Sequence, residues 1–178
     1  MRLFLAIDIP EKVKQQIDNR LKDLKLEYQD LKWVGSENFH ITVHFFGEKP
    51  SADKIIPKID EALFESYSFY MYSLESRLSI KKKVFAYLAF SRNKELEQIV
   101  SRVNGVFNTI NTLKYMPHIT LARYRIPSKQ QYLLLKKKFG KLDINISFKV
   151  SKLTLFDCIN YSEKPEYKIV KEFNLLER

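Results

Sequence analysis

The chain has 178 residues, of which 45% are apolar and 13% aromatic, and its formal net charge is +10. This length and composition suit one globular unit and exclude an intrinsically disordered chain. No apolar run approaches the ~20 residues that a membrane-spanning helix requires, so we expect no membrane partner.

Two further features concern the compartment. The apolar part of the N-terminal stretch is too short for a signal peptide and lacks a small-residue cleavage site, so it predicts a first strand instead. The lone cysteine, Cys158, cannot form an internal disulfide, which is typical of a reducing environment. We therefore expect a cytoplasmic protein.

The first half of the chain predicts alternating strands and helices. The apolar pattern indicates strands over Arg2 to Asp8, Trp33 to Val34 and Phe39 to Phe46. Pro10 suits the first turn of a helix that continues to about Lys25. A second helix is predicted behind Ser51, a good N-cap residue.

The second half repeats this alternation. Helices are predicted over about Asn93 to Ile110 and from Ser128 onward. Lys81 to Lys83 form the expected hairpin tip between two long strands. The strands are predicted at Tyr67 to Ile80, Val84 to Phe90, His118 to Tyr124, Ile144 to Val150, Leu153 to Phe156 and Tyr167 to Phe173.

This order indicates an α+β protein. We expect two pseudo-symmetric lobes built around one another, each an antiparallel sheet packed with helices, around a central cleft. Residues 1–178 would form a single bilobal domain. With four glycines the chain has no glycine-rich phosphate loop, so side chains would have to hold any phosphate.

The most specific feature is a tetrapeptide that occurs twice, as HITV at His40 to Val43 and HITL at His118 to Leu121. The chain has only three histidines and five threonines, so chance rarely produces two His-x-Thr elements. The duplication predicts two half-sites that face each other across one cleft.

Strand alternation predicts which face each motif residue occupies. In both copies the apolar residues, Ile41 and Val43 or Ile119 and Leu121, would point into the core. The same alternation would send Phe39 and Phe45 inward and His44 outward. His40 and Thr42 would share the exposed face of one strand, and His118 and Thr120 that of the other. This spacing lets an imidazole and a hydroxyl contact one small ligand.

Two histidines suit phosphodiester chemistry near neutral pH. With unperturbed pKa values near ~6.5, one imidazole can serve as base while the other serves as acid. In-line displacement requires the acid and the base on opposite sides of phosphorus. Thr42 and Thr120 would donate to non-bridging phosphate oxygens. This scheme requires no metal ion and no other cofactor.

Two other interpretations of the histidines remain open. A single histidine on an amphipathic strand is usually a surface or cleft residue without a catalytic role. Three imidazoles can also hold zinc, and His40, His44 and His118 are the available set. His44 has no counterpart in the second motif, where Ala122 stands, so it is better read as a residue that lines the cleft.

Taken together, the chain resembles the RNA 2′,3′-cyclic phosphodiesterases, the LigT-like 2′-5′ RNA ligase family of the two-histidine phosphoesterase superfamily. The matching segments are RLFLAIDIP at Arg2 to Pro10, LKWVGSENFHITVHFFGE at Leu31 to Glu48, MPHITLAR at Met116 to Arg123, and LTLFDCIN with EYKIVKEFNL between Leu153 and Leu175.

The resemblance implies hydrolysis of RNA 2′,3′-cyclic phosphate ends to 2′-phosphate, with reversible 2′-5′ ligation. By the same resemblance, His40 is the proton donor to the leaving 3′-oxygen and His118 the acceptor that activates water. Phe45 and Arg123, each five residues after its histidine, would contact the terminal nucleotide. Strict alternation along the strands would place both side chains on the face opposite the histidines, so a β-bulge is required to bring them to the ligand. Cys158 stands where the family usually has serine.

We expect as partner an RNA with a 2′,3′-cyclic phosphate end, tRNA fragments among them, and a monomeric protein. Two alternatives remain, an RNA-end-binding protein without relevant turnover and a phosphodiesterase for small cyclic nucleotides. The chain has 31 basic and 21 acidic residues, and this excess either captures RNA or is only a solvated surface. Both interpretations stay open because the basic residues are scattered along the sequence.

Overall fold

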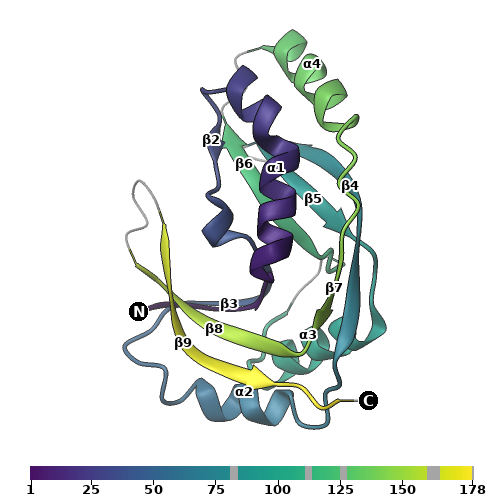
Figure 1. Cartoon of the computed structure of the whole chain (residues 1–178). Helices are drawn as coiled ribbons and strands as arrows, with labels where there is room; N and C mark the ends of the chain where they lie inside the picture. Colours follow the sequence, from purple (N-terminus) through teal and green to yellow (C-terminus); the bar gives the residue numbers. More distant parts are fainter. Residues whose placement is uncertain (81–83, 111–113, 125–127, 160–164, 178) are drawn as a thin grey trace.

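The computed structural model describes residues 1–80, 84–110, 114–124, 128–159 and 165–177 (Figure 1). Within these ranges the chain forms the mixed α+β fold expected, and no described helix is long and apolar enough to cross a membrane. The hairpin tip predicted at Lys81 to Lys83 lies outside the described residues.

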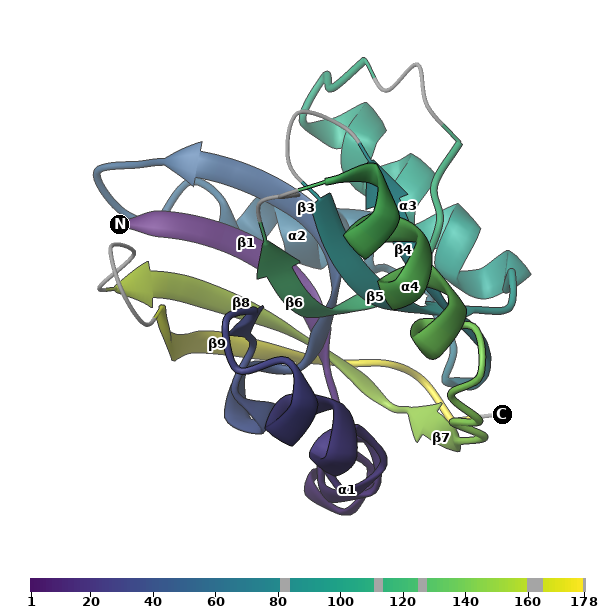
Figure 2. The ribbon, with the colours of Figure 1, turned by 90° about the horizontal axis from the view of Figure 1, so that it is seen from above.

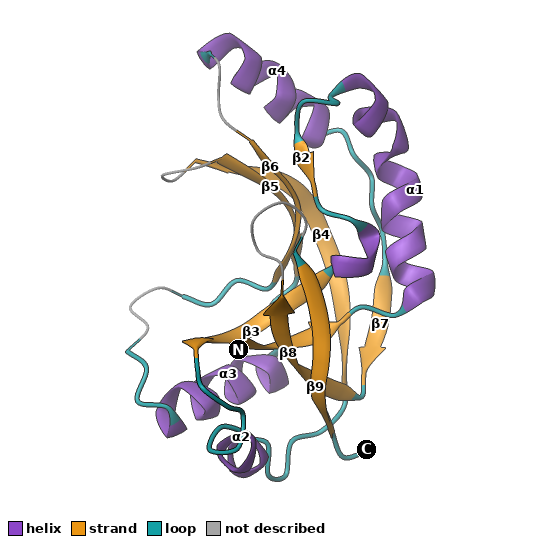
Figure 3. Cartoon of the chain, turned by 90° about the vertical axis from the view of Figure 1, so that its left-hand side faces the viewer, coloured by secondary structure: helices purple, strands orange, loops and turns teal. Residues whose placement is uncertain are grey.

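The strands form one antiparallel sheet in the order β7-β4-β5-β6-β3-β1-β8-β9, with β2 paired to β6. Their bounds are β1 Arg2–Asp8, β2 Lys32–Trp33, β3 His40–Glu48, β4 Phe69–Ile80, β5 Val84–Phe90, β6 His118–Tyr124, β7 Ser147–Val150, β8 Lys152–Ile159 and β9 Glu166–Asn174. The sheet curls strongly, as Figure 3 shows.

Apart from β2, which pairs with β6, the sheet consists of two four-stranded halves that meet at β3 and β6. One half is β7-β4-β5-β6 and the other is β3-β1-β8-β9. They meet at the paired residues Ile41 and Ile119, the central residues of the two His-Ile-Thr elements, and both are fully buried. The duplication seen in the sequence is therefore also a duplication in the sheet.

The helices are α1 Glu11–Glu27, α2 Ile56–Ala62, α3 Lys94–Val106 and α4 Lys129–Phe139. Helices α1 and α4 lie along the half that contains β4, β5 and β6, whereas α2 and α3 lie along the other half (Figures 1 and 3). Seen from above, α1 and α3 lie far apart on opposite sides of the molecule (Figure 2). Helix α1 follows β1 but covers the half that contains β5 and β6. Helix α3 follows β5 but covers the half that contains β1 and β3, so the two halves interlock.

Local sequence signals explain where two of the described helices begin. The Asn93 side chain accepts the Leu96 N–H, and the Ser128 side chain accepts the Gln131 N–H, so α3 and α4 begin where their N-caps predict. The helix expected behind Ser51 starts later, at Ile56, because residues 52–55 form turns. The helix expected to reach Ile110 ends at Val106, just before Asn108 adopts a positive φ of 51°.

The apolar faces of the helices pack on one face of the sheet. Ile17 and Leu21 of α1 and Ile99 and Val103 of α3 join Ile41 and Ile119 in the main core cluster. The apolar side of both motifs thus points to the helix-covered face. The histidines and threonines between these residues project from the other, helix-free face.

Candidate functional site

The four predicted catalytic residues gather around the junction of the two halves. Because β3 and β6 are antiparallel and Ile41 pairs with Ile119, the next position along the register places Thr120 beside His40. On the other side of the Ile41–Ile119 pair, the same register places His118 beside Thr42. All four side chains are half-buried. Each histidine therefore faces the threonine of the other motif across the strand pair.

Both imidazoles are oriented by the same local contact. Nδ1 of His40 lies 2.8 Å from the carbonyl oxygen of Asn38, and Nδ1 of His118 lies 2.8 Å from the carbonyl oxygen of Met116. A carbonyl can only accept, so each Nδ1 carries the proton. In the neutral imidazoles Nε2 then has a lone pair, and in the protonated form it has an N–H, so it is the atom that can exchange a proton.

Aromatic rings surround each histidine. Tyr167 lies edge-on to His40, with ring centroids 5.2 Å apart, and Tyr87 lies edge-on to His118 at 5.4 Å. Phe4 lies 5.0 Å from His40, and Phe85 lies 6.0 Å from His118. These rings limit solvent access and hold the imidazoles in place.

A β-bulge occurs at the same position of each motif. Thr42 pairs with Ala6 and His44 with Leu5, so Val43 is an extra residue in β3. Thr120 pairs with Tyr87 and Ala122 with Ala86, so Leu121 is the corresponding extra residue in β6. Each bulge reverses the alternation of side chains beyond it.

The bulges decide where Phe45 and Arg123 lie. The plain alternation predicted a core position for Phe45, but its side chain is 69% exposed and its ring lies 5.8 Å from Phe4 on the histidine face. Arg123 is exposed as well, and its positive charge acts on His40 and Tyr167 in the other half of the sheet. The bulge that these two positions required is therefore present in both motifs.

The same bulge turns His44 away from the site. It was expected to line the cleft, but it is 8% exposed, and its Nδ1 lies 3.0 Å from Oδ1 of Asn104 in α3. Its ring packs against Phe46 and Phe107. The three-imidazole zinc set is consequently not assembled. Within the described ranges, no other group of three or more His, Cys, Asp or Glu residues is placed to hold a metal ion.

The electrostatic setting of His40 is dominated by burial. Burial is the largest effect and lowers the pKa of His40, the Asn38 carbonyl raises it, and the electrostatic influence of Arg123 and His118 lowers it, with a net pKa of about 4. The carboxylate of Asp8 raises the pKa of His40. In the unliganded protein His40 is therefore neutral at pH 7.

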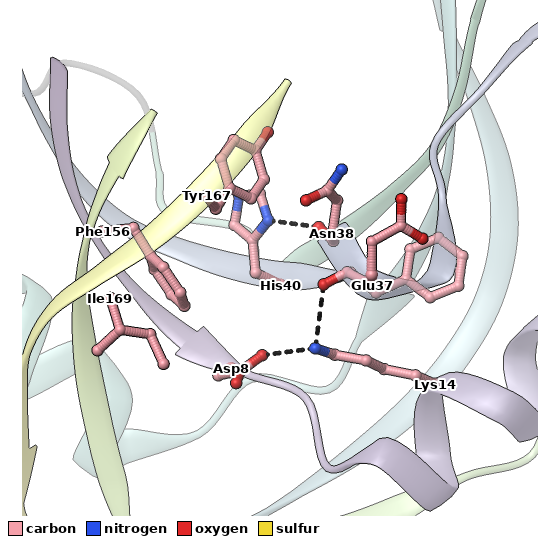
Figure 4. A pocket seen from close by; sticks show the side chains of 9 residues that line it. Asp8, Lys14, Glu37, Asn38, His40, Phe156, Tyr167 and Ile169 are labelled. Atoms are coloured by element: carbon pink, nitrogen blue, oxygen red, sulfur yellow. Dashed lines mark hydrogen bonds and ion pairs between the residues drawn. The ribbon is translucent and has the colours of Figure 1, made fainter. Parts of the chain in front are cut away.

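A pocket of about 140 Å³ lies beside His40 (Figure 4). Phe156 and Tyr167 form part of its wall, and Asp8, Lys14 and Asn38 contribute polar groups. Tyr167 and Cys158 are partners in the β8–β9 register. The thiol that replaces the expected serine is half-buried, and burial raises its pKa.

Several residues of this region carry no motif of their own in the sequence. Tyr115 donates from its hydroxyl to the carbonyl oxygen of Thr42 at 2.8 Å, so the segment before the second motif holds the first. Tyr167 comes from the other end of the chain. Neither residue carries a local sequence signal for its role, because each contact joins segments that are distant in the sequence.

Comparison with known proteins agrees with this geometry. The family model for LigT-like phosphoesterases matches residues 7–75. The RNA 2′,3′-cyclic phosphodiesterase of Methanocaldococcus jannaschii is 27% identical, and the match covers 97% of this chain and all of that protein. The chain is thus similar to the LigT-like phosphoesterases and to these relatives. The protein of the same name from Thermotoga maritima is 26% identical over 97% of the chain and 94% of its own length.

Two solved structures share the fold of this chain. Escherichia coli LigT complexed with 3′-AMP superimposes with a TM-score of 0.74 at 20% identity, covering 98% of this chain and 97% of that one. A second solved structure, the protein TT0787 of Thermus thermophilus, gives a TM-score of 0.71 at 18% identity, with 98% of each chain covered. This chain therefore has the fold of these two solved structures.

Proposed function

We propose that this protein hydrolyses 2′,3′-cyclic phosphate ends of RNA to 2′-phosphate ends, by acid–base catalysis between His40 and His118 without a metal ion. The observation that carries the proposal is the equivalence of the half-sites. Each has an imidazole whose Nδ1 is bound to a backbone carbonyl at 2.8 Å, which leaves Nε2 for proton transfer. Relatives that bear the corresponding name match nearly the whole chain.

The reaction needs one proton removed and one delivered. His118 takes a proton from water as the water oxygen bonds to phosphorus, and His40 gives a proton to the 3′-oxygen as its bond to phosphorus breaks. The product carries a 2′-phosphate and a free 3′-hydroxyl. The attacking and leaving oxygens lie on opposite sides of phosphorus, which matches histidines contributed by opposite halves of the sheet.

The proposed roles of the two histidines also imply on which half of the sheet the terminal nucleoside lies. The leaving 3′-oxygen belongs to the ribose of the terminal nucleotide, so that nucleoside lies on the side of the proton donor. The His40 side presents Phe45, with its exposed ring, and Tyr167 beside the pocket. A base can stack on such rings, and Arg123 can pair with the phosphate.

The low pKa of His40 in the unliganded protein requires the substrate to activate the acid. At pH 7 His40 is neutral because burial lowers its pKa to about 4. A phosphodiester anion placed against Nε2 favours the protonated imidazole and raises this pKa. His40 therefore takes up its proton when the anionic substrate binds, and releases it to the 3′-oxygen.

Thr42 and Thr120 complete the site as hydrogen-bond donors. Each shares a face with the histidine of its own motif, two residues away, and stands across the strand pair from the other histidine. Their hydroxyls can bind the non-bridging oxygens, which gain charge in the transition state. We further propose that the same displacement, with a 5′-hydroxyl in place of water, forms a 2′-5′ linkage as the bond from phosphorus to the 3′-oxygen breaks, and that this ligation is reversible.

The direct test is incubation of a short RNA bearing a 2′,3′-cyclic phosphate with the protein in EDTA. Phosphorus NMR then identifies the product. Formation of 2′-phosphate by the wild type, and its loss in His40→Ala, supports the proposal. Tight binding without turnover would instead favour an RNA-end-binding protein. Turnover of cyclic mononucleotides but not of oligomers would favour a small-nucleotide phosphodiesterase.

A further inference from the structure

The two half-sites differ in one charged pair. In the β1–β3 register Asp8 is the partner of His40, whereas in the β5–β6 register the partner of His118 is Ala89. The carboxylate is therefore present on one side of the site, and an alanine methyl group takes its place on the other. An element that occurs in only one half can give the two histidines different roles.

Asp8 is held by a buried lysine from α1. Nζ of Lys14 lies 2.8 Å from Oδ1 of Asp8 and 3.2 Å from the carbonyl oxygen of Glu37 (Figure 4). The Lys14 side chain is only 9% exposed, and that of Asp8 is 32% exposed. A lysine is almost never buried to this extent without a partner, so these two contacts account for its position.

The lysine also fixes the turn that orients His40. Glu37 and Asn38 belong to the 3-10 turn Ser36–Asn38, and the Asn38 carbonyl accepts the His40 Nδ1–H. The Asn38 side chain donates to the carbonyl oxygen of Pro165 at 2.8 Å, just ahead of the strand that carries Tyr167. Lys14 thus contacts both the carboxylate beside His40 and the turn that holds its ring.

We propose that Asp8 and Lys14 form a positioning pair that makes His40 the proton donor of the reaction, while His118, beside which the described residues place no such pair, serves as the acceptor. Asp8 supplies negative charge that favours the protonated imidazole. Lys14 holds that carboxylate and the Asn38 carbonyl in place. This assignment rests on the proposed function and adds to it the physical reason why two nearly equal half-sites act differently.

The other charged and titratable groups near His40 do not supply this effect. Arg123 and His118, both on β6, oppose protonation of His40. Tyr167 on β9 packs against the ring edge-on, and Cys158 on β8 acts on Tyr167. Among the described residues, Asp8 is the carboxylate whose charge raises the pKa of His40.

The test compares Asp8→Asn, Lys14→Met and the double variant with Lys25→Met. Lys25 lies on the same helix and pairs with Asp18, so it is a matched control. The double variant leaves no buried unpaired charge, which protects its folding. Thermal unfolding is recorded for each protein, together with kcat as a function of pH on RNA with a cyclic end. Proton NMR follows the titration of His40, whose signal is assigned by its loss in His40→Ala.

The two single variants should shift the pH profile in opposite directions. The proton donor must be protonated, so kcat falls as pH rises through its pKa. Asp8→Asn removes the anion and should move this alkaline limb to lower pH, with kcat at pH 7 about tenfold lower, below the ~10²–10⁴ expected for loss of the acid itself. Lys14→Met leaves the carboxylate uncompensated and should move the limb to higher pH while lowering kcat. The double variant loses both charges, so its limb should lie between those of the two single variants, and Lys25→Met should leave the limb unchanged.

A folded Asp8→Asn variant with the wild-type alkaline limb and the wild-type His40 titration would overturn the inference. Equal shifts in Asp8→Asn and Lys14→Met would overturn it as well, as would a double variant whose limb matches that of Lys14→Met. Those outcomes would leave the proposed function standing, provided that His40→Ala and His118→Ala are inactive. If those histidine variants keep their activity, the proposed function itself fails.

Discussion

Ile41 and Ile119 pair across the junction of the two half-sheets, and each is the central residue of a His-Ile-Thr tripeptide. Both are fully buried, so the residues on either side of them must project from the opposite face. Because the strands are antiparallel, the pair stands where a local twofold axis would pass. One buried contact thereby positions both imidazoles and both hydroxyls.

The first prediction concerns the two histidines. His40→Ala and His118→Ala should each lower kcat by roughly 10²–10⁴, the usual contribution of a positioned acid or base. The double variant should lose less than the product of the two factors, because both groups act in one transition state. Single-turnover rates on cyclic-ended RNA measure the effect. A strictly multiplicative loss would mean that the histidines act in separate steps.

The second prediction concerns stability and pH. Burial lowers the pKa of His40 to about 4 in the folded protein, whereas the unfolded chain titrates near ~6.5. The unfolded state therefore binds the proton first, and the free energy of unfolding should fall as pH decreases from about 6.5 to 4. His40→Gln should flatten part of this decrease. Urea titrations across this pH range measure it, and an identical slope in the variant would count against a buried neutral His40. His44, whose pKa is also lowered by burial, should account for another part of the slope.

The third prediction concerns the threonines. Thr42→Val and Thr120→Val should lower kcat more than they raise KM, because their hydroxyls serve the transition state. Thr→Ser keeps the hydroxyl and should be milder at both positions. Tyr115→Phe is a useful comparison, since it removes only the hydrogen bond to the Thr42 carbonyl. An equal loss of kcat in the Thr→Ser and Thr→Val variants would mean that the threonines act through packing.

The fourth prediction concerns capture of the RNA. Arg123→Gln should raise KM for cyclic-ended RNA, whereas Arg92→Gln, on an exposed arginine paired with Glu97, should not. If the +10 charge also binds upstream phosphates, a longer oligomer should have a lower KM than a cyclic mononucleotide. That difference in KM should shrink as salt rises. For a single strand, the logarithm of the binding constant falls against the logarithm of the salt concentration with a slope of about −0.7 per phosphate neutralised. A difference in KM that stays constant with salt would mean that the lysines do not bind the RNA and are only solvated surface residues.

Much of the site could be predicted from the sequence because its signals are local. The alternation around Ile41 and Ile119 placed four residues on one face, and Asn93 and Ser128 marked two helix starts. The prediction failed at His44 and Phe45, since a bulge depends on how the neighbouring strand pairs. Only the need to bring Phe45 and Arg123 to the ligand suggested the bulges in advance, and the register now places them at Val43 and Leu121.

Other parts of the site depend on contacts between distant segments. Lys14 appears in the sequence as an ordinary helix residue, yet it is buried against Asp8 and the turn before His40. Tyr167 reaches His40 only because β9 joins β8 beside β1. Strand order and side-chain reach decide both contacts, and neither is encoded in local periodicity.

The central claim is that two imidazoles from opposite half-sheets process a cyclic phosphate without a metal ion. The most direct measurement is phosphorus NMR of an RNA oligomer with a 2′,3′-cyclic end, incubated in EDTA with the wild type and with each histidine variant. We predict conversion to 2′-phosphate by the wild type and a loss of roughly 10²–10⁴ in rate for His40→Ala and for His118→Ala. A 3′-phosphate product, dependence on added metal, or near-wild-type turnover in either variant would contradict the claim.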